Sequence, residues 1–470
     1  MRVAVFGGGI TGLTASYFLG KKGHQITLFE KEKVLGGLAA GFKQPNWDWY
    51  LEYTYHHLFA NDNDILDFAR EIGFNKIFFK APETASIFEI SNPNLKSKNF
   101  LIHPLDNPID LLRFPFLSLT DKLRAGIILA FLKLSPFFPF YEKQTAEEFL
   151  KKTMGEKVWS ELWQELFRKK FGDYAEIVLA SFIWARIKKR TKNLGYVEGG
   201  FQTLINYIVD ELRSLRVNVL TNYEIREIKK REGKYEIIGH FERSEKSSDR
   251  RERNASLDFS PRRNVGTRND YDIVISTLPT PAMTKLTNNI FPKKYLDKFS
   301  KIKYLHALTL ILETKEPLLE KTYWLNVSTP KIPIMGIVQH TNFMNKKNYG
   351  GNHIAYLGWY LKKEDKLMQM KDEELLDYVM PYLNKITNNQ IPRNKQVSNH
   401  QLPIINSYIF RAPFAQPIFD KEFLKNKPDF KTPLKNFYIA NLDMTYPYDR
   451  GINYAVKLGK QVAGLPAFND

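Results

Sequence analysis

The segment GGGITG, residues 7–12, has the glycine spacing of a loop that holds a diphosphate. Gly7 permits a tight turn, Gly9 lets the backbone approach a phosphate without a Cβ in the way, and Gly12 lets a helix pack closely on a strand. The diphosphate would rest on the helix N-terminus, where unpaired N–H groups and the macrodipole favour negative charge. Glu30 follows Gly12 by 18 residues and can accept hydrogen bonds from a ribose. The pattern predicts a dinucleotide site.

A second glycine pair, Gly36 and Gly37, comes shortly after Glu30. Small residues just beyond the ribose-binding acid can run beside the ribityl and diphosphate part of a cofactor longer than NAD. An ordinary loop would also tolerate two glycines. In this position the pair favours FAD over NAD.

The elements around these residues follow from the apolar pattern. Residues 3–6 and 25–30 read as buried strands and 12–21 as the helix between them, which is a βαβ start. Helical segments dominate from about 104 to 192, another glycine-led helix is expected at 199–215, and strand-like runs recur between 304 and 361. The chain ends with a strand, a loop and a helix. Nucleotide-binding signals therefore stand at the start, middle and end of the chain.

Four stretches resemble the flavin amine oxidase superfamily, which includes protoporphyrinogen oxidases, phytoene desaturases and UDP-galactopyranose mutases. They are GGGITGLTASYFL with FEKEKVLGGLAAGF, then LGYVEGGFQTL, DIVISTLP, and FYIANLDMTYPYDRGINYAVKLGKQVA. The resemblance implies an α/β fold in which a Rossmann-type FAD-binding domain (GR2-like) is assembled from discontinuous segments, with an inserted α+β substrate domain. We expect 1–65, 195–285 and 415–470 to form the FAD-binding domain and 66–194 and 286–414 the substrate domain. The polar stretch 240–269 is expected to be a flexible insertion.

The resemblance also implies a set of cofactor-binding residues. Thr277 would lie near the cofactor, Ile225 would support its adenine end, and the turn before the last helix would lie beneath the isoalloxazine. The predicted set is Gly7, Gly9, Ile10, Thr11, Gly12, Glu30, Lys31, Gly36, Gly37, Leu38, Ile225, Thr277, Arg450, Gly451, Ile452 and Asn453.

The loop LEYTYHHLFAND resembles the histidine-containing loop of the mutases, and it predicts that His56 or His57 faces the flavin. A histidine there could tune the flavin or relay a proton, because its unperturbed pKa is near neutrality. The alternative is a structural histidine. No spaced set of His and carboxylates completes a metal site, so no metal is expected. Arg411 is a weak candidate for a cation on the substrate side.

Composition limits the remaining roles. The formal charge is +18, but the basic residues are spread along the 470 residues with no nucleic-acid motif, so no nucleic-acid partner is expected. The chain has no cysteine and begins directly with a strand-like run, which predicts cytoplasmic location without an export signal. The Phe- and Leu-rich stretch from Phe114 to Phe140 is interpreted mainly as core; the alternative is peripheral membrane contact beside an apolar substrate tunnel.

The favoured function is an FAD-dependent oxidoreductase that takes a hydride from a small organic substrate, with an apolar or isoprenoid compound as one class. The rival is a flavin-dependent nucleotide-sugar mutase, in which no net oxidation occurs. A flavoprotein scaffold without activity is a third hypothesis. The sequence does not identify the substrate, the electron acceptor or the oligomeric state.

Overall fold

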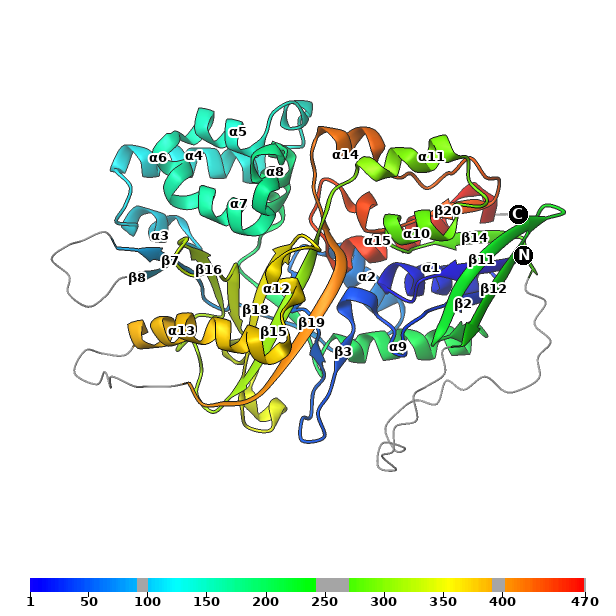
Figure 1. Ribbon diagram of the computed structural model, residues 1–470, viewed down its shortest axis with the longest axis horizontal. Coiled ribbons are helices and arrows are strands. Elements are labelled where there is room, and N and C mark those ends of the chain that lie inside the picture. The colour runs from blue at the N-terminus through cyan, green and yellow to red at the C-terminus, as the bar shows by residue number, and fades with distance from the viewer. Residues whose placement is uncertain (91–99, 242–269, 391–401, 469–470) are drawn as a thin grey trace.

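The computed structural model describes residues 1–90, 100–241, 270–390 and 402–468, and it has two lobes. Figure 1 shows the first lobe at the side where both termini lie. The second lobe consists of a large sheet and a group of helices at the opposite end of the molecule. Most of the predicted insertion 240–269 lies outside the described residues, and His240 and Phe241 belong to a strand.

The first lobe is organised by a five-stranded parallel sheet with the order β10-β2-β1-β14-β20. Its strands are short and mostly apolar, as expected where both faces of a parallel sheet are covered by other elements. They are β1 (Arg2–Phe6), β2 (Gln25–Phe29), β10 (Asn218–Leu220), β14 (Ile273–Ser276) and β20 (Phe437–Ile439). The strands come from the start, middle and end of the chain, as predicted.

Helices with apolar faces cover this sheet. The helix α1 (Ile10–Lys21) packs against α15 (Ile452–Ala463), where a Cβ added at Gly459 would stand 2.7 Å from the carbonyl oxygen of Thr11. Only glycine allows the two helices to approach this closely. The other elements of the first lobe are α2 (Asn63–Glu71), α9 (Phe201–Ser214), α10 (Thr280–Leu286), α11 (Lys293–Asp297), and the antiparallel strands β11 (Tyr223–Arg231), β12 (Lys234–Phe241) and β13 (Asp270–Tyr271).

The second lobe contains a seven-stranded sheet with the order β19-β15-β18-β17-β16-β7-β8. Helix α13 (Asp372–Gln390) packs its apolar residues on this sheet. The strands are β7 (Thr84–Glu89), β8 (Phe100–Pro104), β15 (Tyr304–Thr314), β16 (Trp324–Ser328), β17 (Gly336–Gln339), β18 (His353–Leu361) and β19 (Ile404–Pro417).

Small sheets connect the lobes, and helices complete the second one. The small sheets pair β3 (Gly41–Phe42) with β4 (Leu51–Glu52), and β9 (Leu194–Val197) with β5 (Leu58–Phe59) and β6 (Ile77–Lys80). The helices are α3 (Pro108–Arg113), α4 (Leu119–Leu134), α5 (Ala146–Met154), α6 (Glu156–Val158), α7 (Gln164–Phe171), α8 (Ala180–Lys189), α12 (Lys366–Gln369) and α14 (Lys421–Asn426).

The predicted fold class is confirmed, and two details differ. Strands β7 and β8 precede the helical region and join the large sheet, which the apolar pattern did not indicate. The stretch Phe114–Phe140 forms core only on one side: Phe114, Ala125 and Leu132 are buried, whereas many of its other large side chains are exposed. Among the described residues, no helix is long and apolar enough to cross a membrane.

Candidate functional site

The first glycine turn has the geometry that its sequence predicts. Gly7 has a φ of +99°, which favours glycine, and its N–H donates to the carbonyl of Phe29 over 2.8 Å. A Cβ at Gly12 would stand 2.0 Å from the carbonyl oxygen of Gly7, so α1 begins directly against the turn. The predicted residue Thr277 follows β14 and lies on the other side, where its hydroxyl donates to the carbonyl of Phe6 over 2.8 Å.

The second glycine pair lies on the first turn. The N–H of Gly36 donates to the carbonyl of Gly8 over 2.8 Å, and a Cβ at Gly37 would stand 3.2 Å from the Cα of Gly9. Both Gly36 and Gly37 have positive φ angles, of 120° and 58°. By contrast, a Cβ at Gly9 would meet only the Cα of Gly37, at 3.9 Å. The two turns therefore form a backbone-lined cradle that is open at Gly9.

Glu30 lies at the edge of this cradle. Its Oε2 accepts a hydrogen bond from the N–H of Gly8 over 2.7 Å, and its Oε1 accepts one from the N–H of Glu32 over 2.9 Å. Burial raises the pKa of Glu30, and the two N–H groups act in the opposite direction. Each carboxylate oxygen keeps acceptor capacity for a ribose hydroxyl. Lys31 points elsewhere and pairs at the surface with Glu32.

The cradle fits the diphosphate and ribose of a dinucleotide such as FAD. Helix α1 begins at Ile10 with Gly9 as its N-cap, and neither a side-chain cap nor an acidic residue in its first turn occupies the helix start. Unpaired N–H groups there favour an anion. Thr11 is half-buried beside this start, and Ile225 is half-buried on β11, the strand whose Tyr223 N–H donates to the carbonyl of Glu30.

The start of α15 provides a second uncapped helix N-terminus. Its N-cap is Gly451, which has no side chain that could cap the helix. Ile452 is buried, and the side chain of Asn453 is committed to α2, because its Oδ1 accepts from the N–H of Ile65 and its Nδ2 donates to Asp64. Any contact of Asn453 with the cofactor must therefore come from its backbone. The Arg450 guanidinium lies over the Tyr360 ring, 5.0 Å from the centroid.

The side chains of His56 and His57 contact different parts of the protein. His56 Nδ1 lies 2.6 Å from the carbonyl oxygen of Thr54. Thr54 follows β4, and its hydroxyl donates to the carbonyl of Leu38 over 3.1 Å. His57 contacts the rings of Trp324 and Tyr323, and its Nδ1 is buried with no partner among the described residues. Burial, with the charge of Arg450, lowers the pKa of His56 to about 4.

Burial also lowers the pKa of His57 to about 3, and the charges of His56 and Arg190 add to the effect. Both imidazoles are therefore neutral at pH 7. The two imidazoles thus differ from a solvated histidine, whose pKa lies near neutrality, because burial disfavours the imidazolium. A neutral imidazole can still donate or accept a hydrogen bond.

A buried glutamate beneath this loop was missed by the sequence analysis. Glu52 has no exposed surface; its Oε2 accepts from the Tyr196 hydroxyl over 2.7 Å and its Oε1 from the N–H of Phe201 over 2.8 Å. Burial raises its pKa to about 7. It joins β4, which precedes the histidine loop, to the first residue of α9. Nothing local in LEYTYHH distinguishes it from an exposed acid.

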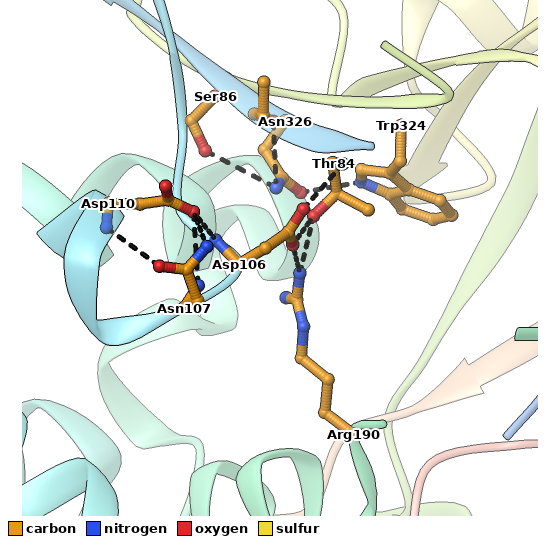
Figure 2. Close-up of polar contacts among 9 residues, drawn as sticks. Thr84, Ser86, Asp106, Asn107, Asp110, Arg190, Trp324 and Asn326 are labelled. Atoms are coloured by element: carbon orange, nitrogen blue, oxygen red, sulfur yellow. Dashed lines mark hydrogen bonds and ion pairs between the residues drawn. The ribbon is translucent and has the colours of Figure 1, made fainter. Parts of the chain in front are cut away.

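A cluster of basic residues lies beside the histidine loop. Figure 2 shows Arg190, just after α8, pointing to Asp106 and Thr84, with Trp324 and Asn326 close by. Lys170 on α7 pairs with Asp449 over 2.8 Å, and its ammonium lies 5.0 Å from the centroid of the Tyr360 ring. The exposed Arg186 of α8 forms no ion pair or hydrogen bond through its side chain within the described residues.

This cluster has more positive than negative charge. Arg190, one turn beyond Arg186 on the chain, reaches Asp106 beside Trp324, and the ring of Trp184 on α8 lies 5.9 Å from the Tyr448 ring. Helix α8 therefore brings Arg186 toward the start of α15, where Arg450 lies over the Tyr360 ring. Arg411, the cation that the sequence analysis considered, is elsewhere: it donates to the carbonyls of Met368 and Met370 at an exposed position. Long-range folding, not local sequence, brings Arg186 and Arg450 together.

Comparison with known proteins agrees with this geometry. The family model of flavin containing amine oxidoreductases matches residues 10–465. A 15-cis-phytoene desaturase from Synechococcus elongatus is 36% identical over 72 residues, a stretch that covers 15% of each protein. The chain therefore matches only a small part of that relative's length.

Two solved structures share the fold over nearly the whole chain. An oxidoreductase from Methanosarcina mazei has a TM-score of 0.70 at 17% identity, and the match covers 98% of this chain and 99% of the oxidoreductase chain. Reduced UDP-galactopyranose mutase has a TM-score of 0.66 at 15% identity, covering 98% and 94%. The family match begins at Ile10, within the first glycine turn, and spans the second turn, the histidine loop and the start of α15. The chain thus belongs to the family of flavin-containing amine oxidoreductases.

Proposed function

We propose that the protein oxidises a small organic substrate that is held against FAD between the two lobes. Bound FAD supplies the chemistry by accepting a hydride from a C–H bond, while the accompanying proton leaves to solvent and O2 or another acceptor later reoxidises the cofactor. The protein then needs only to orient the substrate, exclude water and hold protons. Tyr55, His56 and His57 are half-buried and include no strong base, which suits that role.

The packing of the two glycine turns beside Glu30 carries this proposal. In it, Gly7, Gly9 and Gly12 take the diphosphate with Ile10 and Thr11, Glu30 takes the ribose, and Gly36, Gly37 and Leu38 run along the ribityl chain. Thr277 and Ile225 support the turn and the adenine end. His56 faces the flavin and His57 the substrate, because Arg450 at the start of α15 acts on His56 whereas Trp324 of the second lobe contacts His57.

We further assign 1–65, 195–285 and 415–470 to the FAD-binding domain and 66–194 and 286–414 to the substrate domain. This division is supported by the parallel sheet, whose five strands all come from the first three segments. Two short helices are exceptions to it: α11 is grouped with the first lobe although it lies within 286–414, and α14 with the second although it lies within 415–470.

Anaerobic spectroscopy tests the reaction. The purified protein should be yellow, and the oxidised flavin should bleach when the correct amine, polyprenoid or other reductant is added without any other electron donor. A protein that remains colourless after incubation with FAD contradicts the proposal.

The second candidate is a nucleotide-sugar mutase. It is favoured by the excess of guanidinium groups around Tyr55 and Tyr360, since a sugar nucleotide carries a diphosphate. A protein that converts a nucleotide sugar only after chemical reduction of its flavin, with no net consumption of reductant, would establish this candidate instead.

We also propose that one end of the second lobe contacts an anionic membrane surface. Eight of the thirteen exposed large hydrophobic side chains in the described residues lie between 109 and 140, so the exposed apolar surface is concentrated and not scattered. Five of the eight are Leu119, Leu123, Ile127, Phe131 and Leu134 of α4. Their spacing of three or four residues places them on one face of the helix, hereafter the α4 face.

The charges beside the α4 face suit an anionic bilayer. No charged residue interrupts that face, whereas Lys122 and Arg124 flank it on opposite sides and Arg113 is exposed at the end of α3. Basic side chains at the edges of an apolar face can reach phosphate groups while the apolar face enters the lipid boundary. An apolar groove of about 370 Å³ between Ile128, Phe131, Phe140 and Phe149 adjoins the α4 face, with Lys152 beside it.

Vesicle binding tests this surface. We expect the protein to co-sediment with vesicles of phosphatidylglycerol and phosphatidylcholine, and the double variant L123E/I127E to bind at least about 10-fold more weakly, because two charges oppose burial of the face. Ile405 is 37% exposed on β19, and I405E provides the matched control with unchanged binding. Equal binding of L123E/I127E and wild type contradicts the proposal. So does a wild-type dimer that the double variant converts to monomers, because a second copy would then cover the face.

A further inference from the structure

The basic cluster beside the histidine loop contains two cations, Arg186 and Arg450, that form no ion pair with a carboxylate among the described residues. Although burial acts to lower the pKa of Arg450, the charge of Asp449 helps to raise it. Lys170 is paired with Asp449 over 2.8 Å, and Arg190 with Asp106 over 2.8 Å. Arg186 has neither an ion pair nor a side-chain hydrogen bond within the described residues. Arg450 stacks on Tyr360, and its Nη1 is buried with no hydrogen-bond partner among the described residues. Four cations therefore face two carboxylates.

The positive charges of this cluster repel one another. Burial, followed by the charges of Arg186 and Arg450, acts to lower the pKa of Lys170, which falls to about 8 despite its bond to Asp449. Burial and then Arg186 likewise lower the pKa of Arg190. An anion bound among these cations would offset the repulsion.

Aromatic side chains lie beside these cations. Tyr55 packs edge-on against Trp324 with ring centroids 4.6 Å apart, and Tyr360 carries Lys170 and Arg450 over its ring. Tyr448 and Tyr454 are stacked at 4.6 Å on either side of Asp449 and Arg450 in the chain. Flat apolar groups bind well between such rings, and a guanidinium can bind a carboxylate or phosphate through two parallel hydrogen bonds.

We propose that Arg186 and Arg450 bind an acidic group, a carboxylate or a phosphate, on the substrate of this enzyme. The inference rests on the proposed function, because it takes the space between Tyr55 and Tyr360 as the substrate side of the flavin. It narrows the substrate class to compounds with an acidic end, whatever the rest of their skeleton. Arg186 acts here as a binding residue, and its exposure lets it reach a substrate as it enters.

Calorimetric titration of the FAD-loaded protein tests the proposal with three aromatic probes: benzoate, its neutral isostere benzamide, and phenyl phosphate. We expect benzoate or phenyl phosphate to bind at least about 10-fold more tightly than benzamide, and R186Q to remove that preference while leaving benzamide binding unchanged. The tighter of the two anions identifies a carboxylate or a phosphate site. R186K should recover part of the affinity, because it keeps the charge but not the planar fork.

Two controls separate binding from folding. Arg168 on α7 is an exposed arginine whose nearest ion pair is Glu165 at 3.6 Å, so R168Q should bind all three probes as the wild type does. The thermal midpoint of R186Q should equal or exceed that of the wild type, because the substitution relieves repulsion from Lys170 and Arg190. A structural role for Arg186 predicts a lower midpoint.

Several results overturn the proposal. They are equal affinity for benzoate and benzamide, no binding of either anion, an unchanged preference in R186Q, and loss of FAD from R186Q, which would assign the guanidinium to the cofactor. The ratio of absorbance at about 450 nm to that at 280 nm is recorded first. A protein that cannot be loaded with FAD would refute the proposed function, and anion binding to that protein would still report on Arg186.

Discussion

Gly9→Val is expected to weaken FAD binding by at least about 100-fold while leaving the fold intact. A Cβ at Gly9 meets no protein atom closer than the Cα of Gly37, at 3.9 Å, and the residue has ordinary extended backbone angles. The polypeptide therefore has room for a Cβ at this position. The valine would project into the opening between the two glycine turns, where a diphosphate has to approach the backbone. Losing one or two charge-assisted hydrogen bonds costs about 3 kcal/mol, which is about 100-fold in affinity.

The measurement is the FAD dissociation constant from flavin fluorescence quenching, together with the thermal midpoint of the protein without added FAD. Gly126 on α4 provides the matched control, because a Cβ there meets nothing within 4 Å and its φ is not positive. G126V should change neither value appreciably. G12V should fail to fold, because its Cβ would stand 2.0 Å from the carbonyl oxygen of Gly7. If G9V retained FAD at wild-type affinity, the diphosphate would have to bind elsewhere.

The features that were predicted from the sequence are those that local chain geometry determines. Glycine spacing, the strand before it and the helix after it lie within about thirty residues, so the turn at Gly7 and the position of Glu30 follow from the pattern alone. That Gly36 and Gly37 pack on the first glycine turn is seen only in the structure, because the sequence pattern indicated their position relative to a cofactor. The lobe built from three segments could be anticipated because buried parallel strands are apolar runs that stand out wherever they occur.

The features that could not be predicted depend on contacts between distant residues. Arg186 is one arginine among many in the sequence, and only the packing of α8 against the histidine loop brings it near Tyr55 and Tyr360. The same holds for Glu52, whose partners Tyr196 and Phe201 are about 150 positions away. The low pKa values of His56 and His57 likewise arise from burial by both lobes, whereas reference values describe a solvated side chain.

The α4 face shows a different limit. A Phe- and Leu-rich helical stretch predicts burial, but periodicity does not reveal whether a partner element covers every side of the helix. In the structure Ala125 and Leu132 pack inward, whereas Ile127 and Leu134 are 68% and 80% exposed. Composition therefore indicated an apolar helix, and only the fold distinguishes its core side from its exposed side.

Glu52→Gln is expected to make the protein more stable at alkaline pH. The folded-state pKa of Glu52 is about 7, above its ordinary value of 4.5, because burial disfavours the carboxylate. A group whose pKa is raised on folding stabilises the fold below its unfolded pKa, and that stability is lost as the pH rises from about 4.5 to about 7. Between pH 5 and pH 8 the wild type should lose about 2 kcal/mol through this group, and E52Q should not.

Glutamine suits the site because it has the shape of a protonated glutamate. Its carbonyl can accept the N–H of Phe201, and its amide can donate to the Tyr196 hydroxyl, which reverses the direction of that hydrogen bond. The difference in the free energy of unfolding between E52Q and wild type, measured by urea denaturation at a fixed FAD concentration, should therefore be small at pH 5 and grow toward pH 8. The comparison cancels other buried acids, such as Asp443 with its pKa of about 6. A difference that is independent of pH would mean that Glu52 ionises equally in the folded and unfolded states, and that the Tyr196 and Phe201 donors solvate its charge fully.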